Sequence, residues 1–111
     1  MTEKQGIKRE ERIILEKIRL GELDALWARQ RTLEHFCVED GKGGNRGRLF
    51  YCIYYTDYPQ TAVGLSLKNY ISESTLYRYR REYVRIFWEY YRLKGEKWEE
   101  IENFKKFLKN F

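Results

Sequence analysis

Proline is almost absent from this chain of 111 residues, in which Pro59 is the single example. Charged residues, by contrast, make up 35% of the sequence. This composition favours a mostly helical chain over a β sandwich, because proline-rich turns are missing and charge is plentiful. A length of 111 residues corresponds to one domain.

Long apolar runs are also missing. No stretch approaches the ~20 apolar residues that span a membrane, and the first residues lack the hydrophobic segment of a signal peptide. We therefore expect a soluble, cytoplasmic protein without membrane contact. The two cysteines, Cys37 and Cys52, are not closely spaced, and free thiols are the default in a reducing cytoplasm.

Residues with obvious catalytic chemistry are scarce. The single histidine, His35, has no second histidine or cysteine pair to complete a metal site. No nucleophile is spaced with a base, and Glu99, Glu100 and Glu102 are most simply solvated. The Gly-Lys-Gly-Gly fragment at 41–44 lacks the Gly-Lys-Ser/Thr ending of a phosphate loop. We expect no enzyme activity, no metal and no cofactor.

Aromatic residues and local positive charge are abundant. Aromatic side chains form 17% of the chain, which predicts a core of bulky rings with some hydroxyls that need partners. The net charge is +5, and residues 41–95 hold ten basic and four acidic side chains, while the segments before and after contribute −1 and zero. A local basic excess is expected of a surface that faces phosphate groups.

The basic segment contains a well-marked helix at 72–93. Ser72 suits the N-cap, and Glu73 places negative charge at the positive end of the helix dipole. With about 100° between successive residues, one side carries an apolar stripe of Leu76, Tyr79, Tyr83, Phe87 and Tyr90. The opposite side carries Ser74, Arg78, Arg81, Arg85 and Arg92, and Tyr77 lies at the flank.

An apolar stripe backed by an arginine stripe is typical of a helix that reads the major groove of double-stranded DNA. Arginine suits this role because its planar fork matches guanine edges and phosphate oxygens. We predict DNA contacts from Ser72, Ser74, Thr75, Tyr77, Arg78, Arg81 and Arg85. A surface helix with a solvated basic face is the simpler alternative. Arg80 lies about 40° from Leu76, so we predict that it finds a carboxylate or carbonyl partner instead of DNA.

Residues 71–82, Ile-Ser-Glu-Ser-Thr-Leu-Tyr-Arg-Tyr-Arg-Arg-Glu, resemble the second half of a helix-turn-helix of the sigma region 4 kind. They are more closely similar to the phage late-transcription regulators of the RinA and ArpU type, small proteins with a helical part before such a unit. The close match covers these residues, and the general layout covers the chain. The resemblance implies a transcriptional regulator of phage or prophage origin in a bacterial host cell, with RNA polymerase as a further partner.

The rest of the chain divides around this unit. Residues 1–40 predict a long N-terminal helix, in which Gly21 is either internal or a break into two helices. Residues 41–48 predict a flexible basic loop, and Lys42, Arg46 and Arg48 contact the DNA backbone unless the loop is an ordinary linker. Residues 49–95 form the helix-turn-helix unit, with 49–55 as a buried helix, and 96–111 form an amphipathic C-terminal helix. The expected fold class is therefore a small all-α domain.

The predicted supporting helix, residues 60–68, departs from the usual helix-turn-helix pattern. Leu65 and Leu67 are two residues apart, and Asn69 occupies a place that is usually apolar. A lengthened or irregular turn from Ser66 to Tyr70 would absorb the difference.

Two functions of different classes follow. The first is a sequence-specific DNA-binding regulator that binds as a homodimer, because one recognition helix reads only a few base pairs. A partner chain could cover the apolar positions on either side of the unit: Ile14, Ile18, Trp27, Trp98, Ile101, Leu108 and Phe111. The second is a helical interaction or assembly subunit whose basic stripe meets an acidic partner. A small terminase subunit would be a DNA-binding variant of it with a packaging role.

Overall fold

The computed structural model describes residues 3–40, 45–56 and 61–93, with side chains from residue 8 onward. These residues form five α-helices and contain no strand, which confirms the predicted all-α class. The helices are α1 (Glu3–Arg19), α2 (Leu23–Asp40), α3 (Asn45–Tyr54), α4 (Ala62–Lys68) and α5 (Glu73–Arg92). The predicted helix at 96–111 lies outside the described residues.

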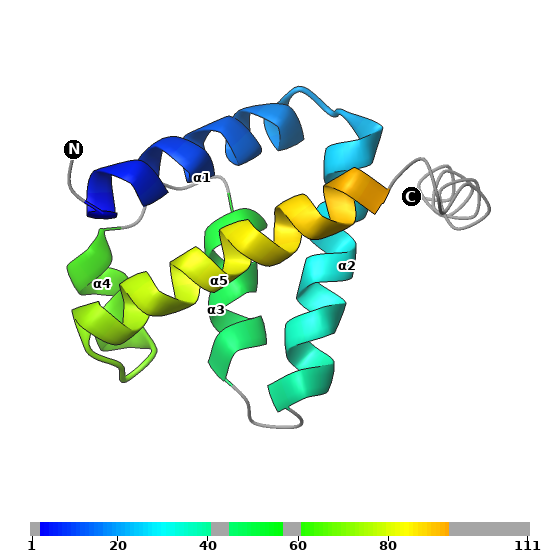
Figure 1. The fold of residues 1–111 in the computed structure, drawn as a ribbon. Helices are drawn as coiled ribbons and strands as arrows, with labels where there is room; N and C mark the ends of the chain where they lie inside the picture. Colours follow the sequence, from blue (N-terminus) through cyan, green and yellow to red (C-terminus); the bar gives the residue numbers. More distant parts are fainter. Residues whose placement is uncertain (1–2, 41–44, 57–60, 94–111) are drawn as a thin grey trace.

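Helix α5 is the element around which the others are arranged. It packs against each of the other four helices. Figure 1 shows α5 running diagonally across the molecule, with α1 along one side, α2 and α3 next to each other, and α4 at the N-terminal end of α5. The position of α5 therefore depends on contacts from the whole described chain.

Residues 1–40 form two helices, which is one of the two outcomes that Gly21 left open. The φ angle of Gly21 is 75°, a left-handed value that suits glycine. The Gly21 N–H donates to the Ile18 carbonyl at 3.0 Å, and the Glu22 N–H donates to the Lys17 carbonyl at 3.1 Å. These are the two hydrogen bonds of a Schellman motif, which closes α1 and turns the chain into α2. Leu20 is 71% exposed at this corner.

Aromatic rings fill the centre of the molecule. Phe36 and Tyr83 meet edge to face with ring centroids 5.0 Å apart, and Phe50 stacks on Tyr54 at 4.4 Å. Such pairs contribute about 0.5–1.5 kcal/mol each beyond the burial of apolar area. The fully buried side chains come from four helices: Ile14, Ala25, Ala28, Thr32, Leu49, Phe50, Leu76, Tyr83 and Phe87.

The buried tyrosine hydroxyls have hydrogen-bond partners, as the composition predicted. Tyr83 donates to the carbonyl of Arg46 at 2.6 Å, and Tyr54 donates to Glu11 Oε2 at 3.5 Å. Burial raises the pKa of Tyr54 well above its usual range, so this hydroxyl stays protonated and donates. The rings thus contribute apolar area without leaving a buried hydroxyl unsatisfied.

Helix α3 confirms the helix predicted at 49–55 but begins earlier. It starts at Asn45, so residues 45–48 are helical and the predicted loop is wrong for them. Gly47 lies against α2, where an added Cβ would approach Cys37 Sγ to 2.7 Å. Because α3 begins at Asn45 and packs closely on α2 at Gly47, the Arg46 side chain lies over α2 and α5.

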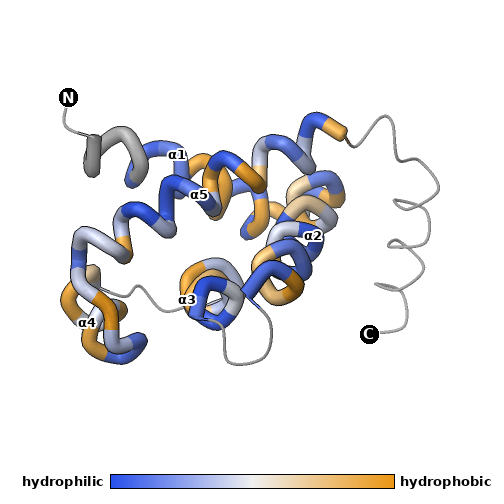
Figure 2. Tube along the Cα trace, turned by 60° about the horizontal axis from the view of Figure 1, so that its bottom comes forward, coloured by the Kyte–Doolittle hydropathy of each residue, from blue (hydrophilic) through white to orange (hydrophobic). Residues whose placement is uncertain are grey.

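No helix of the described residues is long and apolar enough to cross a membrane. In Figure 2 the solvent-facing side of α5 is mainly hydrophilic, while hydrophobic positions lie where the helices meet. Helix α4 is an exception, since hydrophobic positions lie on its outer side.

Candidate functional site

The N-terminus of α5 is capped by Ser72, as predicted. Its Oγ accepts the Thr75 N–H at 3.1 Å, and Glu73 lies in the first turn. The hydroxyls of Ser74 and Thr75 lie 3.1 and 2.9 Å from the same Ser72 oxygen. Three hydroxyl groups therefore gather where α5 begins, and those of Ser72 and Ser74 belong to exposed residues.

The two faces of α5 separate in the structure as the periodicity predicts. The inward face buries Leu76, Tyr77, Tyr83, Val84, Ile86 and Phe87. The outward face carries Ser74, Arg78, Arg85 and Arg92, which are exposed, and Arg81, which is half-buried. Four arginines thus share one side of α5, opposite its buried face.

Three of the outward arginines, Arg78, Arg85 and Arg92, make contacts within α5. Arg85 Nη1 lies 3.2 Å from Glu89 Oε1, and the side chains of Arg85 and Glu89 are 63% and 50% exposed. Exposed ion pairs of this kind contribute about 0–1 kcal/mol. Arg78 lies 5.5 Å from the ring centroid of Tyr79, and Arg92 donates to the Trp88 carbonyl at 3.3 Å. A phosphate group could replace these contacts at little energetic cost.

Arg80 points the other way, into the protein. Its Nε donates to both carboxylate oxygens of Glu11, at 2.9 and 3.0 Å, and its Nη2 also donates to Glu11. The side chains of Arg80 and Glu11 are 13% and 5% exposed. The predicted carboxylate partner of Arg80 is thereby confirmed, and it ties α5 to α1.

Tyr77 is the first of two site residues that the structure corrects. It is 8% exposed, and the guanidinium of Arg80 lies 4.9 Å from its ring centroid. The tyrosine serves as a surface on which the Arg80 side chain lies, so little of the ring is left for DNA. We therefore remove Tyr77 from the interface.

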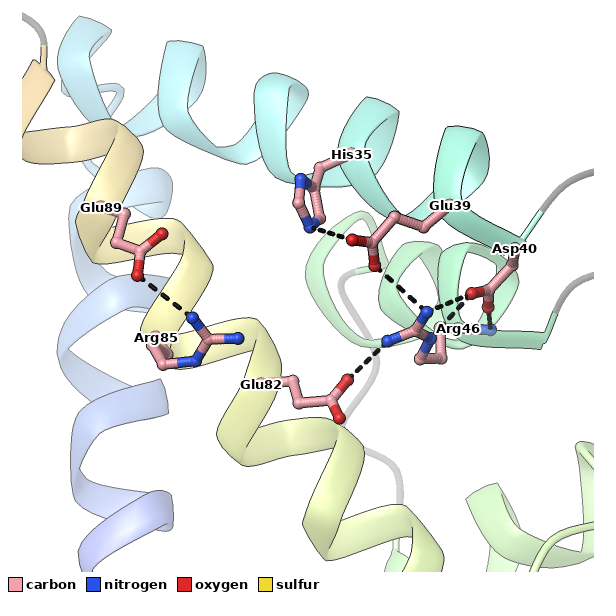
Figure 3. A network of polar contacts seen from close by, with 7 residues as sticks. All are labelled: His35, Glu39, Asp40, Arg46, Glu82, Arg85 and Glu89. Carbon is pink, nitrogen blue, oxygen red and sulfur yellow. Dashed lines mark hydrogen bonds and ion pairs between the residues drawn. The ribbon is translucent and has the colours of Figure 1, made fainter.

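Arg46 is the second correction, because it is the centre of an ion-pair network (Figure 3). Its guanidinium binds Asp40 at 2.5 Å, Glu82 at 2.8 Å and Glu39 at 3.2 Å, and its backbone N–H donates to Asp40 at 3.0 Å. Glu39 also lies 3.4 Å from His35 Nε2. Three carboxylates surround the single positive charge of Arg46. The side chain therefore joins α2, α3 and α5 instead of facing a phosphate.

Of the other two cations of the predicted loop, Arg48 is among the described residues and Lys42 is not. Arg48 is an exposed residue of α3. Lys42 lies outside the described residues. Arg48 therefore belongs to α3 and not to α5.

Helix α4 leads into α5 through a turn of four residues, 69–72. Asn69 explains the departure from the expected pattern: it is 5% exposed, and its side-chain amide donates to the Leu65 carbonyl at 2.9 Å. The amide thus closes the end of α4 from inside the protein. Leu65 and Ser66 are buried, whereas Leu67 is 70% exposed. The two leucines point to different sides because only one of them faces α5.

The described part of the chain contains no group of three or more histidine, cysteine, aspartate or glutamate side chains that could hold a metal ion. The carboxylates around Arg46 are engaged with its guanidinium. What the arrangement offers is a rigid helix with an exposed cationic face.

Comparisons with protein-family models, curated proteins and solved structures found no match to this chain.

Proposed function

We propose that this protein binds double-stranded DNA and reads its sequence in the major groove with α5. The observation that carries the proposal is the outward face of α5, on which Arg78, Arg81, Arg85 and Arg92 lie opposite the buried face. The major groove is about 12 Å wide and admits an α-helix, and arginine can bind both guanine edges and phosphates.

Three further features support the proposal. The unit from 61 to 93 holds six basic and three acidic side chains. A short helix, a tight turn and a longer helix follow each other in it, as in a helix-turn-helix. The buried Arg80–Glu11 pair and the Arg46 network hold α5 in one orientation on α1, α2 and α3. A rigidly held helix keeps its outward side chains in register with base edges.

The biological role that we infer is transcriptional regulation by a phage or prophage protein in the cytoplasm of a bacterial host. This part rests on the resemblance of residues 71–82. RNA polymerase would then be a second partner.

We also propose that the protein binds DNA as a homodimer, because one helix reads too few base pairs for specificity. One of the two apolar stripes that suggested a partner is already covered within the chain, since Ile14 and Trp27 are 0% and 2% exposed. The other stripe lies in residues 98–111, outside the described part. Light scattering of the DNA complex should give two chains per site, and one chain per site would refute the dimer.

The alternative function is a helical assembly subunit, including one with a DNA-packaging role like a small terminase subunit. Part of the aromatic content lies in the core and is not free to form a partner surface, since Trp27, Phe36, Phe50, Tyr54 and Phe87 are buried. A DNA-packaging subunit would still bind DNA, so sequence selectivity has to separate it from a regulator.

The test is binding of the full chain to a random duplex pool, followed by selection. We expect retention at 50 mM salt that falls about 100-fold by 200 mM, as for a protein with about four phosphate contacts. Repeated selection should enrich one motif. Absence of retention at low salt would refute DNA binding, and retention without any enriched motif would favour the packaging role.

A further inference from the structure

Two helices of this protein end in the same motif with different residues at its key position. Gly21 follows α1 with φ 75°, and Tyr70 follows α4 with φ 56°. The Tyr70 N–H donates to the Leu67 carbonyl at 3.3 Å, and the Ile71 N–H donates to the Ser66 carbonyl at 3.0 Å. This is the Schellman hydrogen-bond pair that also closes α1.

Glycine is the usual residue at this position, because a side chain clashes with the following carbonyl in the left-handed region. Tyr70 is the one residue other than glycine with positive φ in the described ranges. Its side chain is 92% exposed, so the ring adds no burial that would offset the unfavourable backbone. A strained residue whose side chain contributes nothing to the core is a candidate for a role in binding.

The neighbours of Tyr70 form a surface with it. Val63, Leu67 and Tyr70 follow one another at the spacing of one helix face and are 55%, 70% and 92% exposed. Lys68 is the only charged residue from 61 to 72 and is exposed. We call these four residues the α4 surface. It ends two residues before the Ser72 cap of α5.

We propose that the α4 surface is a second DNA contact, which binds the sugar–phosphate backbone beside the groove that α5 enters. The inference rests on the proposed function and deepens it. The side chains of Val63 and Leu67 pack on deoxyribose, while the Tyr70 hydroxyl and Lys68 bind phosphate. These contacts fix the register of α5 on the duplex, as backbone contacts do in DNA-binding proteins.

Charge selects DNA over a protein as the occupant. The α4 surface has a cation and no carboxylate, and it adjoins the helix that carries the outward arginines. Three apolar side chains alone fall well short of the 20–30 residues that each partner contributes to a typical protein interface.

The test compares Tyr70→Asn and Tyr70→Gly with the parent chain, because both replacements tolerate the left-handed backbone. We expect melting temperatures equal to or above that of the parent, together with a five- to tenfold loss of affinity for the selected duplex. Tyr70→Phe should lose about threefold, as only the hydroxyl is removed. Tyr51→Asn, at a 53% exposed tyrosine of α3, is the matched control and should bind as the parent does.

Lys68→Ala provides an independent readout. It should lower the slope of log affinity against log salt by about 1, whereas Tyr70→Asn should leave that slope unchanged. Light scattering of the free variants checks self-association, which we expect to match the parent.

Three results would overturn the inference. The first is parental DNA affinity in both Tyr70→Asn and Lys68→Ala. The second is a clear fall in melting temperature in Tyr70→Gly, which would show that the tyrosine serves folding. The third is altered self-association with unaltered DNA affinity, which would assign the α4 surface to a second copy of the chain. Failure of the proposed function is distinguishable from all three, because the parent chain itself would then not bind duplex DNA.

Discussion

Arg80 and Glu11 form a buried ion pair across 69 positions of sequence, with the Nε of Arg80 2.9 and 3.0 Å from the two carboxylate oxygens. The pair joins the middle of α5 to α1, and Tyr54 donates a hydrogen bond to the same carboxylate from α3. One carboxylate thus links three helices. It holds the inward side of the helix whose outward side we assign to DNA.

Arg80→Ala should destabilise the fold by about 3–5 kcal/mol, because it leaves the buried Glu11 carboxylate without its cation. Urea unfolding followed by circular dichroism measures this loss. The double replacement Glu11→Leu with Arg80→Met should recover most of the stability, since it removes both charges together. DNA affinity of the folded double variant should stay near that of the parent. Normal stability of Arg80→Ala together with lost DNA binding would mean that Arg80 faces DNA.

Acid should weaken the Arg46 network through Asp40. Hydrogen bonds from Arg46 lower the pKa of Asp40 in the folded protein below its ordinary value of 3.8. A group of this kind stabilises the fold above its unfolded-state pKa, and the contribution is lost as pH falls through the folded-state pKa. Asp40→Asn should therefore lower the free energy of unfolding by about 1.5–3 kcal/mol at pH 6, and the gap to the parent should narrow as pH falls below 3.8. A gap that does not narrow below this pH would contradict the charged role of Asp40.

Gly47 should be intolerant of a side chain, because an added Cβ would lie 2.7 Å from Cys37 Sγ and 3.3 Å from the Cys37 backbone nitrogen. Gly47→Ala is expected to cost about 1–3 kcal/mol in thermal or urea unfolding, as for other overpacked contacts. Adding Cys37→Ala should restore part of this loss, since it removes the sulfur but not the backbone atom. Cys37→Ala alone is the control and should be close to neutral at this exposed position. Unchanged stability of Gly47→Ala would show that α2 and α3 are not in close contact there.

Arg78 and Arg85 should differ in what their loss does to specificity. Arg78 is nearer the Ser72 cap, where base edges are usually reached, and Arg85 lies two turns further along α5. Arg78→Ala should lose about 1–3 kcal/mol on the selected duplex and relax the preference at one base pair. Arg85→Ala should weaken binding to all sequences alike and reduce the salt slope by about 1. The same motif from both variants in selection experiments would refute the division of roles.

Local signals in the sequence predicted α5 well. The Ser72 cap, the outward arginines and the inward position of Arg80 depend on helix periodicity and on the first turn, which are properties of neighbouring residues. The break at Gly21 was one of the two alternatives that the sequence left open, since a glycine inside a helical pattern is itself a local signal. The all-α class follows from the composition and from these periodic segments.

Contacts between residues that are distant in the chain could not be predicted from the sequence. Arg46 and Glu82 are 36 positions apart, so nothing local indicated that Arg46 would bind carboxylates from two other helices. Tyr77 was placed at the flank of α5, because the sequence does not show that Arg80 would lie over its ring. The sequence pattern suggested an irregular turn from Ser66 to Tyr70, but it did not indicate that Tyr70 takes the left-handed conformation, since a left-handed helix end is usually marked by glycine.

The central claim is that the outward face of α5 binds DNA, and one matched comparison tests it most directly. Arg19 resembles Arg85 in having a highly exposed side chain, at 70%, and in pairing with a glutamate of its own helix, Glu16 at 2.5 Å. Affinity for the selected duplex at a fixed 100 mM salt is measured for Arg19→Ala and for the chain with Arg78, Arg81 and Arg85 all changed to alanine. The account predicts parental affinity for the former and a loss of at least 100-fold for the latter. Equal affinity of the triple variant and the parent would contradict it.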